Sequence, residues 1–299
     1  MKHIVISVIA VLLSQASAQD AQQEAPAPWD QWATSNPSWV ENTEPFRIID
    51  NIYYVGTKGI GVFLITSNSG HILIDGGMPQ NAGAVAGNIK TLGYDIKDVK
   101  ALLNSHAHFD HSGGLKALKE MSGAVMIASE GDRSALEGGF YLGAEDNINY
   151  SAPPVSVDRI IKDGESVQIG EAALTANLTP GHTRGCTSWT MTAIENGKPY
   201  DVLFFCSATV AGNSLNPPQY EGIIEDYRET FKKTKDWRPD IFLANHPGFF
   251  KMTSKRAAQM NGDELAFVDR ETFPAMIKRL EQAFEQSLTE ALAIEATSE

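Results

Sequence analysis

Basic residues are scarce in this sequence. Its 299 residues include 24 Lys and Arg against 37 Asp and Glu, which gives a formal charge of -13. Such a chain repels nucleic acid and anionic membrane surfaces unless a local basic patch opposes the net charge, and the sequence contains no basic cluster. Low-complexity tracts, short-period repeats and the Ser-x-x-Lys and Gly-x-Ser-x-Gly motifs of serine acyl-enzymes are also absent from the sequence. We therefore expect no nucleic-acid partner and no serine nucleophile, in a chain whose 42% apolar content is enough for one large domain or two small ones.

Hydrophobic runs are short throughout. Residues 4–13 are almost wholly apolar, and Ala16-Ser17-Ala18 is a small-x-small cleavage site, so residues 1–18 predict a signal peptide. The run is about half of the ~20 residues that a bilayer crossing requires, which makes an uncleaved membrane anchor the weaker alternative. No later stretch is long enough to span a membrane. We expect cleavage near Ala18 and a periplasmic or secreted protein.

The pattern of the remaining chain predicts an N-terminal arm at residues 19–45 and one domain at residues 46–299. We interpret the three tryptophans of the arm as packing anchors, with Trp39 as the one that could border a pocket. β-branched and aromatic runs between turn residues predict strands at 52–55, 61–66, 71–74, 99–104, 124–128, 159–161, 166–169, 173–178, 187–192, 202–205 and 241–244. Helical spacing of apolar residues predicts helices at 79–92, 114–121, around 224–231 and at 273–294.

These elements form two strand-rich blocks, each closed by helices. This order predicts an α/β fold in which two sheets pack on each other with helices outside. Residues 130–154 are rich in Gly and Asn and are long for a plain connection, so we expect a functional loop there, in which residues 135–139 could form a helical turn.

The strongest chemical signal is the motif His106-Ala107-His108-Phe109-Asp110-His111, which directly follows an apolar run. His106 and His108 are two residues apart on an extended segment and so point the same way, whereas Asp110 and His111 fall where the chain turns toward a helix. One loop can therefore present imidazoles and a carboxylate to two neighbouring positions.

Two further histidines, His182 and His246, each lie at the end of an apolar strand beside a Pro/Gly turn. This setting matches that of the motif and favours metal ligands over structural histidines. His71 lacks it, and we interpret that residue as an ordinary strand-edge histidine.

Five imidazoles and one carboxylate suit zinc better than calcium or magnesium, which prefer oxygen ligands. Six ligands exceed what one tetrahedral ion accepts, so the set predicts two zinc ions per chain, about 3.5 Å apart and sharing a hydroxide. A single closed zinc site would bind only four of these six side chains.

The motif, the preceding Leu73-Ile74-Asp75-Gly76-Gly77, His182 and His246 together resemble the metallo-β-lactamase superfamily. The resemblance covers the chain from about Phe46 to the final helix and implies an αββα sandwich. It also implies the ligand sets. Carried over residue by residue, the first zinc is bound by His106, His108 and His182, and the second by Asp110, His111 and His246. The Asp75 turn is expected to supply a supporting carboxylate.

The superfamily includes lactonases, thioester hydrolases and nucleases, so the motif alone does not determine the substrate. Glyoxalase II-like enzymes and lactonases usually place a metal-bridging aspartate after the strand that corresponds to residues 202–205. Here the segment is Phe205-Cys206-Ser207-Ala208-Thr209, without a carboxylate. It resembles subclass B3 metallo-β-lactamases, which implies that Ser207 and Thr209 contact the substrate.

Cys206 admits two interpretations. A thiolate at this position is a good zinc ligand. However, Cys186 stands four residues after His182, beside the same site, and the even number of cysteines in an oxidising compartment favours a Cys186–Cys206 disulfide. Some enzymes of the same subclass contain this bridge.

The sequence thus predicts a secreted di-zinc β-lactamase that hydrolyses the β-lactam amide of penicillins, cephalosporins and carbapenems, giving antibiotic resistance. Asp110 is the expected catalytic residue, because it directs the attacking hydroxide. We expect a monomer that acts on a small molecule. The alternatives are another hydrolase of the same fold (a lactonase or thioesterase), a non-catalytic zinc-binding protein, and a membrane-tethered structural protein, which leaves the metal motif unexplained.

Overall fold

The computed structural model describes residues 27–298, with the side chains of residues 294–298 left aside. The signal-peptide prediction for residues 1–18, with cleavage near Ala18, lies outside the described residues, as does the first part of the N-terminal arm. Within the described part of the chain, none of the helices combines the length and apolar character that a bilayer crossing requires.

Two β-sheets form the centre of the molecule. The first has seven strands that pair in sequence order. They are β1 (Phe46–Ile49), β2 (Ile52–Tyr54), β3 (Phe63–Ile65), β4 (His71–Ile74), β5 (Val99–Leu103), β6 (Val125–Ser129) and β7 (Arg159–Ile161). The pairs from β1 to β4 are antiparallel, and those from β4 to β7 are parallel. The parallel strands bring their carboxyl ends, and the residues that follow them, to one edge of the sheet.

The second sheet has five strands in the order β12-β11-β10-β9-β8. They are β8 (Ser166–Ile169), β9 (Ala172–Leu178), β10 (Thr187–Glu195), β11 (Lys198–Phe205) and β12 (Ile241–Ala244). β8 to β11 form an antiparallel meander, and β12 pairs with β11 in parallel. Connections through hairpins explain the first three pairs, whereas the parallel pair requires a helical crossover.

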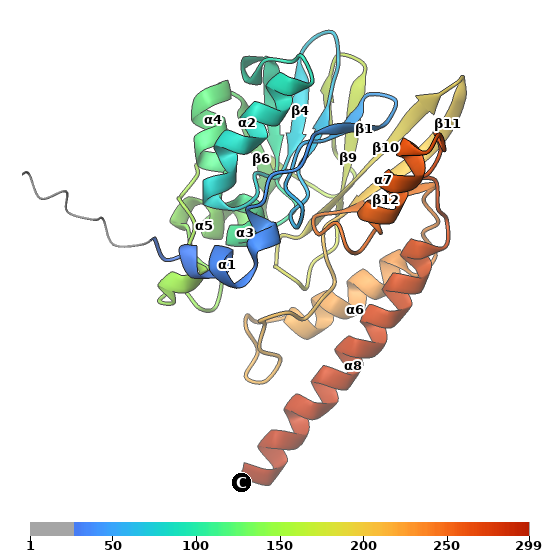
Figure 1. The fold of residues 1–299 in the computed structure, drawn as a ribbon. Coiled ribbons are helices and arrows are strands. Elements are labelled where there is room, and N and C mark those ends of the chain that lie inside the picture. Colours follow the sequence, from blue (N-terminus) through green and yellow to red (C-terminus); the bar gives the residue numbers. More distant parts are fainter. Residues whose placement is uncertain (1–26, 299) are drawn as a thin grey trace, which may run out of the picture.

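Helices lie outside both sheets (Figure 1). They are α1 (Asp30–Ser35), α2 (Ala82–Thr91), α3 (Phe109–Ser112), α4 (Leu115–Ser122), α5 (Glu130–Gly138), α6 (Ile223–Thr234), α7 (Met252–Met260) and α8 (Thr272–Ser298). Short 3₁₀ turns occur at Pro37–Trp39, Pro79–Asn81, Ile96–Asp98 and Ile148–Tyr150. The far end of α8 extends away from the rest of the molecule, and α1 lies close to α3, with the Trp32 ring 5.6 Å from the Phe109 ring (Figure 1).

Two apolar cores hold these layers together. One contains inward-facing residues of both sheets together with residues of α6 and α8, and it includes the fully buried Trp189. The other lies between the first sheet and its helices, with Val85 of α2 and Leu118 of α4 against Leu102 of β5. Burial of apolar surface on both sides of each sheet is what fixes the four layers. The predicted α/β sandwich of two sheets with helices outside is confirmed.

The local predictions differ from the structure at several elements. Residues 130–138 form the helix α5, where we expected only a turn at 135–139. Two acidic residues in its first turn favour a helix N-terminus, and Gly139 ends it in the left-handed conformation. The strand β1 and the helices α1, α3 and α7 were not predicted. α7 buries only Met252 and Lys255, so its sequence carries a weak periodic signal and packing decides its conformation.

Candidate metal centre

The six predicted ligands meet at one edge of the two sheets. His106 and His108 lie on the loop that follows β5, and Asp110 and His111 lie in the short helix α3. Exposed fractions within this motif are 1% for His106, 8% for His108, 7% for Asp110 and 1% for His111. The loop therefore places polar side chains in a nearly dry environment, which is costly unless they bind something.

The second sheet supplies the other two histidines. His182 follows β9 after a tight turn in which Gly181 has a φ of +126°, and a Cβ atom there would lie 2.7 Å from the Tyr227 ring. Only glycine fits this close approach without a shift of the neighbouring helix. His246 follows β12. The site thus assembles from the ends of strands in both sheets, and His71 lies elsewhere, edge-on to Tyr94 at a ring distance of 4.8 Å.

The first cluster consists of His106, His108 and His182. One ring nitrogen of each lies within 4.8 Å of the corresponding nitrogen of the other two. Ring centroids are separated by 4.6 to 4.7 Å in all three pairs. Three buried imidazoles at this spacing form the donor set of a tetrahedral metal with one position left for another ligand.

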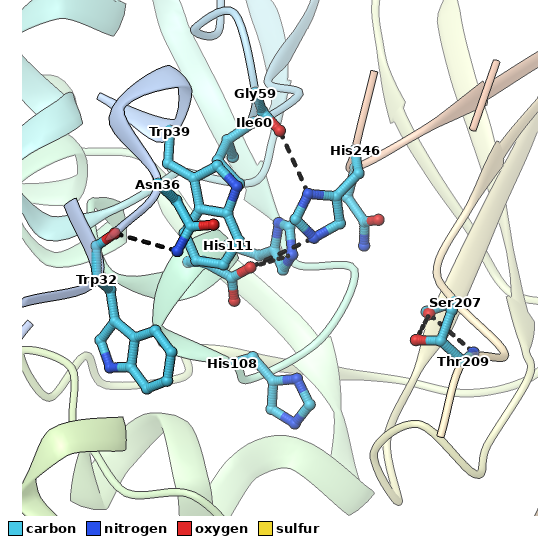
Figure 2. A network of polar contacts seen from close by, with 12 residues as sticks. Trp32, Asn36, Trp39, Gly59, Ile60, His108, His111, Ser207, Thr209 and His246 are labelled. Atoms are coloured by element: carbon cyan, nitrogen blue, oxygen red, sulfur yellow. Dashed lines mark hydrogen bonds and ion pairs between the residues drawn. The ribbon is translucent and has the colours of Figure 1, made fainter. Parts of the chain in front are cut away.

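The second cluster is centred on Asp110. Its Oδ2 atom lies 3.0 Å from Nε2 of His111 and 3.4 Å from Nε2 of His246. Figure 2 shows His111 and His246 beside each other, with the carboxylate contact between them. His111 and His106 also approach, with ring centroids 4.5 Å apart. The two clusters are therefore adjacent, as the sequence predicted.

Hydrogen bonds orient the rings toward the clusters. Nδ1 of His182 lies 2.7 Å from the Thr209 carbonyl oxygen, and Nδ1 of His246 lies 3.2 Å from that of Gly59. A carbonyl can only accept, so each Nδ1 carries the hydrogen and donates it. This assignment leaves the Nε2 lone pair of each ring available for a metal.

His106 is oriented through a short relay. The hydroxyl of Ser105 donates to Oδ2 of Asp75 at 2.7 Å. The Ser105 hydroxyl oxygen also lies 3.1 Å from Nδ1 of His106. Because the hydroxyl hydrogen is used on Asp75, the oxygen accepts from His106. Burial raises the pKa of Asp75 to about 6. Asp75 thus acts as the supporting carboxylate that the sequence predicted.

The electrostatics differ between the two clusters. Burial, and the neighbouring imidazoles, keep the pKa of His106 and His108 well below the ordinary value, and burial lowers that of His182 to about 4. Burial opposes ionisation of Asp110, but the adjacent His111 and His246 lower its pKa well below the ordinary value. The first cluster is therefore neutral at pH 7 and ready to bind a cation without losing protons first.

The residues fit a metal. Nε2 of His106 is buried and has no hydrogen-bond partner, although it faces the other rings. A buried nitrogen without a partner costs free energy unless a ligand satisfies it. The donor set of imidazoles and one carboxylate suits zinc.

Ser207 and Thr209 follow β11 and lie together at one side of the histidines (Figure 2). Their hydroxyl oxygens are 3.2 Å apart, and the backbone N–H of Thr209 donates to the Ser207 hydroxyl. Thr209 also positions His182 through its carbonyl oxygen. Their contact with a substrate stays a prediction.

The N-terminal arm and the 139–151 segment border the site. The Trp39 ring lies 5.7 Å from the His246 ring, as expected for a residue at the pocket (Figure 2). The Trp32 indole nitrogen donates to the Asn149 carbonyl oxygen at 2.6 Å, and its ring stacks on Tyr150. The arm is therefore joined to the long connection that we expected to be functional.

Sequence reasoning missed Tyr141. Its ring stacks on His108 with centroids 4.3 Å apart and an angle of 11° between the planes. Its hydroxyl donates to the Asn213 side chain, whose amide nitrogen donates to the His182 carbonyl oxygen. These residues come from segments far apart in the chain, so no local pattern could have indicated them.

Cys186 and Cys206 form the predicted disulfide. The Cys206 Sγ atom lies 3.6 Å from Nδ1 of His106, so the bridge lies directly behind a ligand of the first cluster. A disulfide offers no thiolate, and the structure does not support the alternative in which Cys206 binds zinc.

Replacing both cysteines with serine is expected to lower the free energy of unfolding by about 3 kcal/mol, because the bridge closes a loop between residues 20 apart. Urea unfolding of the oxidised protein and of the double variant measures the difference. Wild-type protein treated with a reductant serves as the control and should match the variant. Equal unfolding midpoints for all three samples would contradict the expectation.

Two wide hollows on the described part of the chain contain none of the six candidate ligands. A groove of about 640 Å³ lies on the second sheet beside Trp237, and another of about 780 Å³ lies beside His71 and Tyr94. Neither gathers unpartnered ligand atoms as the histidine clusters do, so the chemistry of the side chains locates the site better than the size of the hollow.

Comparison with known proteins agrees with this geometry. The family model described as the metallo-beta-lactamase superfamily matches residues 56–192. The solved structure of BJP-1, described as a subclass B3 metallo-beta-lactamase of Bradyrhizobium japonicum, is 43% identical, with a TM-score of 0.84. The match covers 88% of this chain and 99% of that one. This chain belongs to the metallo-beta-lactamase superfamily. The fold of the superfamily implies a divalent metal, typically zinc.

Curated relatives in sequence have other activities. A hydroxyacylglutathione hydrolase of Rhodospirillum rubrum is 32% identical over 107 residues, which are 36% of this chain and 34% of that protein. The N-acyl homoserine lactonase AttM of Agrobacterium fabrum is 28% identical over 162 residues, 46% of this chain and 60% of the lactonase. The chain thus spans about a third of the first relative's length. Membership of the metallo-beta-lactamase superfamily alone leaves the substrate open.

Proposed function

We propose that this protein is a zinc-dependent hydrolase that opens the amide of β-lactams, with penicillins, cephalosporins and carbapenems as its substrate class and antibiotic resistance as its consequence. The proposal includes two zinc ions per chain, one bound by His106, His108 and His182 and one by Asp110, His111 and His246. It also includes export and action as a monomer, which follow from the sequence prediction.

One observation carries the choice of substrate. Among the described residues, Asp110 is the only carboxylate in the groups of ligand atoms around these histidines. The segment after β11, where lactonases and glyoxalase II-like enzymes usually supply a bridging aspartate, contributes instead a disulfide-bonded Cys206 and the hydroxyls of Ser207 and Thr209. The similarity to BJP-1 over almost its whole length supports the same choice.

The protein's own residues then have separate tasks. Zinc, when bound, would lower the pKa of a water molecule and polarise the carbonyl group of the substrate. Asp110 accepts a hydrogen bond from the attacking water and so directs its lone pair toward the carbonyl carbon. With a single carboxylate among six ligands, the pocket stays cationic in an acidic protein, which favours a substrate that carries a carboxylate. Ser207 and Thr209 donate hydrogen bonds to that carboxylate, directly or through water.

The test compares four substrates with one preparation of zinc-loaded protein. We expect efficient turnover of nitrocefin and imipenem, resistance to clavulanate, and far lower turnover of S-lactoylglutathione and an acyl-homoserine lactone. Clavulanate is informative because it inhibits through an acylated serine, and this chain has neither of the serine acyl-enzyme motifs. Efficient hydrolysis of the last two substrates with nitrocefin and imipenem intact would favour the thioesterase or lactonase alternative, which the sequence relatives suggest.

The hydroxyl pair provides a prediction about binding. Ser207→Ala combined with Thr209→Val is expected to raise KM by about tenfold and to change kcat much less, because a contact equal in ground state and transition state affects binding alone. Steady-state kinetics with nitrocefin measures both constants. Thr192→Val, on an exposed position of β10, is the matched control. An unchanged KM for every β-lactam tested would remove the pair from the substrate site.

A further inference from the structure

Asp132 lies in the first turn of α5 and is only 2% exposed. It belongs to neither histidine cluster, and no cation contacts it among the ion pairs of the described residues. An ionised carboxylate in such a place requires strong hydrogen bonds. Its position in the first turn of a helix adds a favourable interaction with the helix dipole.

Both oxygens of Asp132 accept hydrogen bonds from the loops that carry the first cluster. Oδ2 accepts from the backbone N–H of Ala107 at 3.0 Å and from the Thr183 hydroxyl at 2.9 Å. Oδ1 accepts from the backbone N–H of Gly185 at 2.9 Å. Ala107 stands between the ligands His106 and His108, and Thr183 directly follows the ligand His182. One carboxylate therefore joins the loop after β5 to the loop after β9.

Two glycines permit this junction. A Cβ atom on Gly185 would lie 2.3 Å from the backbone nitrogen of Asp132, and one on Gly131 would lie 2.6 Å from the carbonyl oxygen of Arg184. Helix α5 and the 182–186 loop are thus in backbone contact. Ser129, just before the helix, completes the junction by donating to the Gly185 carbonyl oxygen at 2.6 Å.

The three hydrogen-bond donors around Asp132 determine which side chain this position can hold. All three partners of Asp132 present an N–H or O–H hydrogen, so the residue must accept three times. A carboxylate does so with both oxygens, whereas an amide of the same shape turns an NH₂ group against one of the donors. The lost hydrogen bond would then displace both the loop after β5 and the loop after β9, because both loops bond to the Asp132 side chain.

We propose that Asp132 is a positioning residue for the first metal cluster, which sets the distance between the His106–His108 loop and the His182 loop. It does not touch metal or substrate. The proposal rests on the zinc-binding part of the proposed function and is independent of the substrate. Hydrogen-bond partners of metal ligands typically change metal affinity by 10- to 100-fold when they are removed, and Asp132 bonds to residues directly next to His106, His108 and His182.

The test measures zinc affinity by competition with a chromophoric chelator, without any β-lactam. Asp132→Asn is expected to weaken the tighter zinc site about 10- to 100-fold. The control is Asp240→Asn, since Asp240 also accepts a backbone N–H, from Asp201 at 2.9 Å, and pairs with Arg270 away from the histidines. The control should lose thermal stability and keep the wild-type zinc affinity. The absorption spectrum of cobalt in the site should shift for Asp132→Asn and not for Asp240→Asn.

A second variant covers the case in which Asp132→Asn does not fold. Thr183→Val removes a single donor and is expected to weaken zinc about three- to tenfold, with a less than additive effect in the double variant. Wild-type zinc affinity in a folded Asp132→Asn protein, or in Thr183→Val, would overturn the positioning role. Failure of the wild-type protein to bind zinc would instead overturn the proposed function.

Discussion

Removal of zinc is expected to reduce β-lactam hydrolysis by ~10³-fold or more, and His182→Ala is expected to produce a similar loss at ordinary zinc concentrations. A metal ion that polarises a carbonyl contributes several kcal/mol to catalysis, and about 4 kcal/mol corresponds to ~10³-fold in rate. His182 is 6% exposed, and its Nδ1 is bound to the Thr209 carbonyl oxygen, so Nε2 is oriented into the cluster. The alanine variant lacks one of three nitrogens that lie within 4.8 Å of one another.

The measurement combines nitrocefin turnover with zinc analysis before and after dialysis against EDTA. Restored activity on return of zinc would separate metal loss from unfolding. His71→Ala is the matched control, because His71 is also buried, at 6% exposure, but packs against Tyr94 outside the site. It should retain zinc and turnover per folded molecule. Full activity of metal-free protein, confirmed by analysis, would contradict the zinc-dependent reaction.

Asp110→Asn is expected to lower kcat/KM by about 10²- to 10⁴-fold, the range associated with a positioned acid–base group. Oδ2 of Asp110 contacts Nε2 of both His111 and His246, so the carboxylate connects the two histidines of the second cluster. An asparagine keeps the shape but removes the negative charge, and its oxygen is a weaker acceptor for the attacking water. We therefore expect loss of catalysis together with loss of zinc from the second site.

Steady-state kinetics and zinc counts per chain test this expectation on the same samples. Asp98→Asn is the control, since Asp98 is exposed and pairs only loosely with Lys100 at 3.9 Å. It should match the wild type in both measurements. A folded Asp110→Asn protein with activity within threefold of wild type would exclude Asp110 from the chemistry, whatever its zinc content.

The six candidate ligands could be singled out from the sequence because each carries a local signal. The spacing of His106, His108, Asp110 and His111 places their side chains on one short segment, and His182 and His246 each follow an apolar strand and precede a turn. Strand ends of a sandwich meet at an edge, so six such residues were expected to converge, as they do. The disulfide was also expected, although the sequence left zinc binding by Cys206 open.

The supporting residues carry no such signal. Tyr141 and Asn213 lie in connections, and Asp132 lies in a helix that the sequence predicted only in part. Each contacts a candidate ligand or its loop across 25 or more residues of sequence. A pattern of neighbours along the chain contains no information about such contacts, because they arise only when the layers pack.

Sequence alone thus indicated the kind of chemistry: an acidic chain without basic clusters, a dense histidine and aspartate motif, and neither of the serine acyl-enzyme motifs. Those features depend on side-chain type and on spacings of two to four residues, which are local properties of the sequence. The folded structure decided how the chemistry is supported. It closed the disulfide behind His106, stacked Tyr141 on His108, joined the arm to the 139–151 segment through Trp32, and brought Asp132 between two ligand loops. These contacts exist because burial of both faces of two sheets forces distant segments together, and that requirement is a property of the whole core.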